Sequence, residues 1–216
     1  MLQAQTDRPN ILLINVDDVG YGDFGVYGQQ LVKTPRIDQL AAEGLRFTAM
    51  YAGAPVCGPS RASLLTARHA GRIASCNNGQ ANLSTFPSWV TRIRDAGYAT
   101  ALIGKQHKAN LNGETVTGDA PTDRGFTESY GWLNAVDAHQ HFVDGATVTQ
   151  GWNRRQYLFG TDASGEVVRQ DIDPSRYVQN EFRDRALAYL DDHRDEPFLL
   201  YLPFTIAHAE LVVPIG

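Results

Sequence analysis

Cys57 lies in a stretch whose residue types could activate a side chain for chemistry on an anionic ester. It belongs to the run Val-Cys-Gly-Pro-Ser-Arg, residues 56–61, which continues as Ala-Ser-Leu-Leu-Thr. Because proline is favoured at the first position of a helix, we expect a helix that begins at Pro59. Cys57 would then lie at the positive end of the helix dipole, where unpaired N–H groups and Arg61, one turn further on, attract an anion. The pattern predicts a site for negative charge, and a passive buried thiol is the alternative.

Two adjacent acids, Asp17 and Asp18, directly follow the apolar run of residues 10–16. Charge at the end of a buried strand is costly unless it is compensated, and carboxylate oxygens are the ligands that hard divalent cations prefer. The pair therefore predicts a metal site. The residues alone leave open that both acids are solvated or cap a turn.

Three further polar side chains follow runs that are expected to be strands. Lys105 and His107 come after residues 98–104, and His208 comes after residues 197–204. Because ligands collect beyond the carboxyl ends of parallel strands, we expect these side chains to lie near the two acids. Each residue also has an alternative when it is considered singly. Lys105 and His107 could be ordinary surface residues, and His208 could have a structural role.

His139 belongs to the segment Asp-Ala-His-Gln-His-Phe, residues 137–142. The segment could line a substrate pocket, and the spacing of its histidines also permits a second metal site. A polar loop without a role in chemistry is the alternative.

The elements that must position these residues alternate between strands and helices. Strands are expected at residues 10–16, 45–51, 98–104 and 197–204, the first of them as a buried central strand. Further helices are expected at residues 35–44, 86–97 and 175–192. This order predicts an α/β fold, with a mostly parallel central sheet sandwiched by helices. Residues 108–172 are rich in Gly, Thr, Asp and Asn, and are expected to form an irregular, pocket-forming insertion.

Composition excludes several classes of protein. The chain has 216 residues, 43% of them hydrophobic, which suffices for a sizeable core. Its net charge of −5 and the absence of a basic run argue against binding to nucleic acid. No apolar stretch approaches the roughly 20 residues that span a bilayer, so no membrane association is expected. The two cysteines, Cys57 and Cys76, permit at most one disulfide.

Together these motifs resemble the formylglycine-dependent sulfatases, a family of the alkaline phosphatase superfamily. The resemblance begins with Cys-Gly-Pro-Ser-Arg and the following Ala-x-Leu-Leu-Thr. It extends to the opening strand with its acid pair, to Gly97–His107, which is similar to the second signature of the family, and to the segment around His208. Gln106 replaces the aromatic residue common at its position, and Ala207 and Glu210 replace the prolines of the family's Pro-His-x-Pro.

The resemblance implies an alkaline-phosphatase-like fold and a mechanism. A maturation enzyme would oxidise Cys57 to formylglycine, and the hydrated aldehyde would attack the sulfur of a sulfated small molecule or glycan. Asp17, Asp18 and residue 57 would bind Ca²⁺, with Mg²⁺ as the alternative. Arg61 and Lys105 would offset charge on the sulfuryl oxygens. His107 would act as a base, His208 would contact the sulfate and protonate the leaving oxygen, and His139 would line the pocket.

The resemblance also implies that residues 1–216 are the N-terminal part of a sulfatase catalytic domain, because the family carries a later Asp-Asn metal pair and a further lysine. Two alternatives stay open: an inactive fragment or pseudoenzyme that only binds an anionic ligand, and a phosphate or phosphonate monoester hydrolase of the same superfamily. The polar residues 1–7 lack an apolar signal region, as at the mature end of a periplasmic or secreted protein, and a cytoplasmic location is the alternative.

Overall fold

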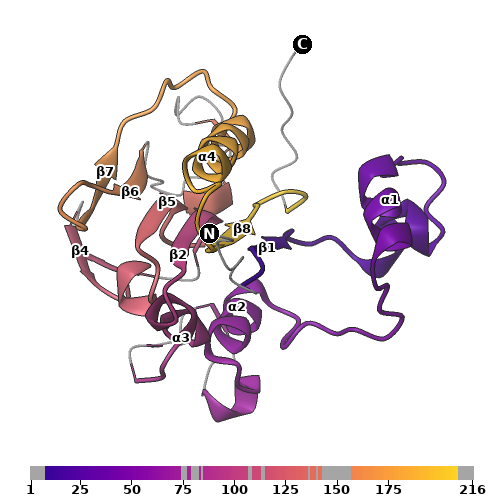
Figure 1. Ribbon diagram of the computed structural model, residues 1–216, viewed down its shortest axis with the longest axis horizontal. Coiled ribbons are helices and arrows are strands. Elements are labelled where there is room, and N and C mark those ends of the chain that lie inside the picture. Colours follow the sequence, from indigo (N-terminus) through magenta and orange to yellow (C-terminus); the bar gives the residue numbers. More distant parts are fainter. Residues whose placement is uncertain are drawn as a thin grey trace, which may run out of the picture.

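A six-stranded sheet forms the centre of the molecule, in the order β1-β8-β2-β5-β6-β7 (Figure 1). The computed structural model describes residues 8–73, 77–78, 83, 85–106, 109–112, 115–135, 137–139, 141–142 and 157–208. The strands of the sheet are β1 (Ile11–Asn15), β2 (Ala99–Lys105), β5 (Glu128–Trp132), β6 (Leu158–Thr161), β7 (Val167–Gln170) and β8 (Phe198–Pro203). The pairings β1–β8, β8–β2 and β2–β5 are parallel, while β5–β6 and β6–β7 are antiparallel. The predicted α/β fold with a mainly parallel sheet is confirmed.

The described part of the chain contains four α-helices: α1 (Pro35–Glu43), α2 (Cys57–Thr66), α3 (Trp89–Asp95) and α4 (Val178–Asp192). Helix α1 lies apart from the sheet, whereas α2, α3 and α4 lie beside it (Figure 1). Helix α1 begins at Pro35, as predicted, and Thr34 is its N-cap residue. Helix α3 lies inside its predicted range and is capped by Ser88, whose side chain accepts from the backbone N–H of Val90. Helix α4 begins three residues later than expected. No helix among the described residues is long and apolar enough to cross a membrane.

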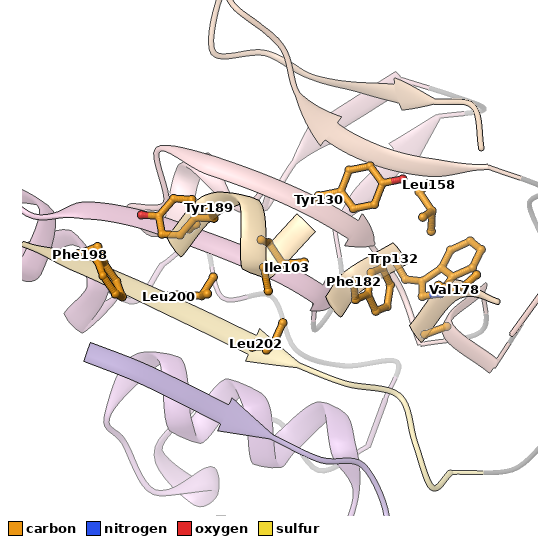
Figure 2. Packing of buried hydrophobic residues seen from close by; sticks show 13 residues of the cluster. Ile103, Tyr130, Trp132, Leu158, Val178, Phe182, Tyr189, Phe198, Leu200 and Leu202 are labelled. Atoms are coloured by element: carbon orange, nitrogen blue, oxygen red, sulfur yellow. The ribbon is translucent and has the colours of Figure 1, made fainter. Parts of the chain in front are cut away.

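Successive side chains of β2 and β8 point to opposite faces of the sheet, so both faces carry apolar side chains. Helices cover both of these faces. On one face, α4 packs against the sheet in the cluster drawn in Figure 2. Its labelled members are Ile103, Tyr130, Trp132, Leu158, Val178, Phe182, Tyr189, Phe198, Leu200 and Leu202. On the other face, Leu65 of α2 and Val90 of α3 pack with residues of β2 and β8. Both clusters hold the strands whose ends carry the polar residues discussed below.

Replacement of Phe182 by alanine is expected to lower the free energy of unfolding by about 3–5 kcal/mol, because this side chain is 0% exposed and leaves a cavity between α4 and the sheet. The measurement is urea unfolding followed by circular dichroism. Leu187→Ala, at a position of the same helix that is 55% exposed, is the control and should change the free energy by less than about 1 kcal/mol. Equal losses in the two variants would contradict this packing.

Strand β1 lies at an edge of the described sheet, so the prediction of a buried central strand is wrong for these residues. Ile11 and Leu13 pack towards α2 and α3, whereas Leu12 and Ile14 are 48% and 54% exposed. Its apolar run suits a strand covered on both faces, but described elements cover only one of them.

Residues 45–51 form no strand, contrary to the prediction. Large apolar side chains of this segment are exposed, among them Leu45 and Tyr51, and no described strand lies beside it to complete a ladder. The residue pattern of this segment does not suffice for a strand, because a strand forms only where a neighbour supplies hydrogen bonds.

The prediction of an irregular segment over residues 108–172 is also wrong, because it contains β5, β6, β7 and a small hairpin of β3 (Asn110–Asn112) and β4 (Thr115–Gly118). A glycine-rich composition favours loops, but Gly131 lies within β5. An ideal Cβ added there would lie 1.9 Å from the carbonyl oxygen of Gly104. The glycine therefore permits close approach of β5 to β2, which is a role of glycine inside sheets.

Candidate active site

The polar residues that follow β1, β2 and β8 meet at one edge of the sheet. β8 pairs with both other strands, and all three run parallel, so their carboxyl ends lie side by side. The backbone N–H of Asp17, after β1, donates to the carbonyl of Ile206, after β8, at 2.9 Å. Lys105 is the last residue of β2, and its Nζ lies 2.5 Å from Oδ2 of Asp17. The structure thus brings together residues that are 88 positions apart in the sequence.

Cys57 is the first residue of helix α2, so the expectation of a helix that begins at Pro59 is wrong by two residues. The N-cap residue is Val56, and its carbonyl accepts from the N–H of Ser60 at 3.0 Å, which closes the first turn. Pro59 fits within this turn because the first N–H groups of a helix have no partner inside it. Residue 57 therefore stands at the positive end of the helix, as expected.

The side chains of Asp17, Arg61 and Lys105 form a buried ionic cluster. They are 5%, 3% and 1% exposed. Arg61 Nη2 lies 3.5 Å from the same Asp17 oxygen that contacts Lys105, and Arg61 Nη1 donates to the backbone carbonyl of Lys105 at 2.9 Å. Two cations share one carboxylate, which leaves an excess positive charge. Such a charge is costly to bury without a partner, so the cluster favours an anionic ligand.

Cys57 lies beside this cluster, with its Sγ 3.7 Å from Nζ of Lys105. A second polar neighbour is Asn78, whose Oδ1 lies 3.6 Å from Sγ. Arg61 also has an Nε that is buried and has no hydrogen-bond partner among the described residues, so a donor remains for a ligand.

An open pocket of about 380 Å³ lies in front of the cluster. It is bounded by the end of β1, by the loop before α2 and by the first turn of α2. Its lining residues are Ile14, Asn15, Val16, Asp17, Asp18, Val19, Ala52, Ala54, Pro55, Val56, Cys57, Ser60 and Arg61. Cys57, Asp17 and Arg61 therefore share one cavity.

Asp18, His208 and His139 form a second group next to the cluster. Asp18 has a φ of 56°, a left-handed conformation that is uncommon outside glycine, and its side chain is 61% exposed. Nε2 of His208 lies 3.5 Å from Oδ2 of Asp18. The ring of His139 stacks on that of His208 at a centroid distance of 4.1 Å. The structure thus places both histidines on the side of Asp18.

The family model described as Sulfatase matches residues 9–214. The chain belongs to the sulfatase family. Human arylsulfatase D is 40% identical over 72% of this chain and 29% of its own length. Two solved structures cover 96% of this chain with a TM-score of 0.78. They are the PsFucS1 sulfatase from Pseudoalteromonas sp., 30% identical, and Ps i-CgsB in complex with k-i-k-neocarrahexaose, 28% identical.

The sulfatase neighbours share the alkaline-phosphatase-like fold, as predicted. The chain spans less than a third of arylsulfatase D and about half of the two solved structures, 46% of PsFucS1 and 47% of Ps i-CgsB. Family membership follows from the match over nearly all of this chain.

The donor set fits a hard divalent cation in kind, because Asp17 and Asp18 offer carboxylate oxygens. In number the described residues fall short: no group of three or more His, Cys, Asp or Glu side chains among them could hold a metal ion. Ca²⁺ takes six to eight oxygens in proteins. Asp17 and Asp18 alone therefore offer fewer oxygen donors than such a cation needs.

Two residues that the sequence singled out, His107 and Cys76, lie outside the described residues. The role of His107 stays a prediction. Gln106, where sulfatases commonly have an aromatic residue, is buried and donates from Nε2 to the carbonyl of Asp119 at 2.7 Å. The carboxylate of Asp119 pairs with Arg124. A buried polar network therefore occupies the surroundings of Gln106.

Sequence reasoning missed Asn78, which contacts Cys57 from a loop 21 residues further along the chain. A signal was present, since Val56 has no side-chain acceptor to cap the helix that begins at Cys57. A helix without its own cap needs an acceptor from elsewhere, but the sequence does not say which of several polar residues supplies it.

Proposed function

We propose that this chain forms a centre for the hydrolysis of sulfate esters, with residue 57 as the nucleophile after oxidation of Cys57 to formylglycine. The observation that carries the proposal is the buried pair Arg61 and Lys105, which share the single carboxylate of Asp17 next to Cys57. A sulfate monoester is an anion, and these two side chains offer it charge-assisted donors next to residue 57. Family membership supports the same reaction.

The roles of the side chains follow from what each can donate. The side chains of Lys105 and Arg61 can only donate hydrogen bonds. They would therefore hold the sulfuryl oxygens and offset the negative charge that grows on these oxygens during attack. His208, beside Asp18, would protonate the departing alcohol oxygen. His107, in the position of the family's second histidine, would remove the proton whose loss releases sulfate. The aldehyde hydrate itself supplies two hydroxyl groups on one carbon, one for attack and one for release.

Asp17, Asp18 and an oxygen of residue 57 would hold a divalent cation, Ca²⁺ in the first place and Mg²⁺ as the alternative. When bound, the cation supplies Lewis-acid polarisation of the ester. Asp17 would then hold the cation and Lys105 together, because one carboxylate has about four lone-pair sites. The described donors alone predict weak binding of the cation.

The substrate class we propose is a sulfated glycan or a small sulfated molecule. Ps i-CgsB was solved with a neocarrahexaose, and relatives include arylsulfatase D and N-acetylgalactosamine-6-sulfatase of Sus scrofa. His139, stacked on His208, would lie on the alcohol side of the bound ester. The proposal includes a maturation enzyme that oxidises Cys57, and a periplasmic or secreted location.

We expect the chain, co-expressed with a formylglycine-generating enzyme, to lose about 18 Da in the peptide that contains residue 57, the difference between the thiol and the aldehyde. The matured chain should hydrolyse an aryl sulfate in the presence of Ca²⁺ and should act more slowly on an aryl phosphate. Preference for the phosphate would indicate the phosphate or phosphonate hydrolases of the superfamily. Tight binding of the sulfate without turnover would indicate a binding protein instead.

A further inference from the structure

Helix α2 takes its N-terminal cap from a distant part of the chain. Its N-cap residue, Val56, makes no side-chain cap hydrogen bond. Instead Oδ1 of Asn78, 20 residues beyond Gly58, accepts from the backbone N–H of Gly58 at 2.9 Å. The first N–H groups of a helix lack partners, and an asparagine oxygen is a preferred acceptor for them. Asn78 therefore stabilises the turn that carries Cys57.

The contact with Gly58 also fixes which atom of Asn78 faces position 57. A backbone N–H can only donate, so the amide atom turned towards it must be the carbonyl oxygen. The same Oδ1 lies 3.6 Å from Sγ of Cys57, which donates to it. Lys105 Nζ lies 3.7 Å from Sγ and, in contrast, can only donate hydrogen bonds. The side chain at position 57 thus has one neutral acceptor and one cationic donor as neighbours.

We propose that Asn78 is a positioning residue for the nucleophile at position 57, an inference that depends on the function proposed above. Hydration of the aldehyde adds one water molecule to the carbonyl and gives two hydroxyl groups on one carbon. The acceptor Asn78 favours the hydroxyl that keeps its proton. The donor Lys105 stabilises negative charge on the oxygen of the other hydroxyl, the one that attacks. The two neighbours therefore make the two hydroxyl groups inequivalent before substrate binds.

The proposal predicts a specific effect of Asn78→Ala in the matured chain. One neutral hydrogen bond contributes about fivefold to tenfold to an equilibrium. The ratio of hydrate to free aldehyde at residue 57 should fall by about that factor, and kcat should fall similarly with little change in KM. Asn78→Asp keeps an acceptor and should keep the hydrate ratio, but its negative charge should raise KM for the anionic ester.

The test measures the hydrate ratio by ¹³C NMR in chains labelled at cysteine and matured by the formylglycine-generating enzyme. Ser88→Ala is the matched control, because Ser88 caps α3 by accepting from Val90 N–H at 3.2 Å. Loss of that cap should lower stability as much as Asn78→Ala does, without changing the hydrate ratio or kcat. Equal hydrate ratios in the wild type and in Asn78→Ala would overturn the inference and reduce Asn78 to a helix cap.

Different measurements test the proposed function and the role of Asn78. A chain that carries the aldehyde but hydrolyses no aryl sulfate contradicts that function, while the hydrate ratio still tests Asn78. If Cys57 is not oxidised at all, the function is contradicted and the thiol becomes the probe. Because Oδ1 of Asn78 covers Sγ, Asn78→Ala should then speed the alkylation of Cys57 by iodoacetamide several-fold, and Ser88→Ala should not. Equal alkylation rates in all three chains would overturn the positioning role.

Discussion

Replacement of Cys57 by alanine is expected to lower aryl sulfate turnover by about 10³-fold or more, because the side chain that attacks sulfur is then absent. Folding should be affected little, since Cys57 is only partly buried and lies on the rim of an open pocket. The measurements are steady-state turnover and thermal unfolding of the matured wild type and of the variant. Retention of more than a tenth of the activity would place the nucleophile elsewhere.

Cys57→Ser gives a sharper result than the alanine variant. A serine has one hydroxyl group, which can attack sulfur beside Lys105 and expel the alcohol, but it has no second hydroxyl whose deprotonation releases the sulfate. We therefore expect at most one turnover per chain and a covalent gain of about 80 Da at this position. Cys57→Ala is the control and should gain nothing. Repeated turnover by the serine variant would contradict release through a hydrate.

The convergence of Asp17, Lys105 and His208 could be predicted from the sequence, because each follows an apolar run and the ends of parallel strands share one edge of a sheet. No contact had to be known for that step. The pairing of β8 with both β1 and β2 then brings the three ends together. The sequence could not predict that Lys105 and Arg61 would share the carboxylate of Asp17, since that depends on side-chain reach.

Other features depended on contacts that no local pattern encodes. Gly131 indicates a loop by composition, but in the sheet it permits β5 to approach Gly104 closely. The start of α2 at Cys57 was missed because proline is also tolerated later in the first turn, and because the cap comes from Asn78. The edge position of β1 depends on which strands lie beside it, and an apolar run alone does not give strand order.

Asp17→Asn is expected to lower both the stability and the activity of the protein, with the second-largest effect of the substitutions considered. The carboxylate of Asp17 is the shared partner of Arg61 and Lys105, both of which are nearly fully buried. Its removal leaves two buried cations without their counter-ion, so we expect the free energy of unfolding to fall by about 3–5 kcal/mol. The measurement is urea unfolding in the presence of a chelator, so that no metal contributes.

Asp18→Asn is the matched control, since it changes the neighbouring carboxylate to the same amide. The side chain of Asp18 is 61% exposed, and asparagine tolerates the left-handed backbone at this position, so stability should change by less than about 1 kcal/mol. The two variants should lose the stabilisation by Ca²⁺ to the same extent. If both acids hold Ca²⁺, the cation raises the melting temperature of the wild type by linkage, and either substitution removes that rise. If Ca²⁺ still raises the melting temperature of Asp18→Asn, Asp17 binds the cation without Asp18. The two carboxylates would then have different roles: Asp17 balances the buried cations, and Asp18 acts on the solvent side of the pocket.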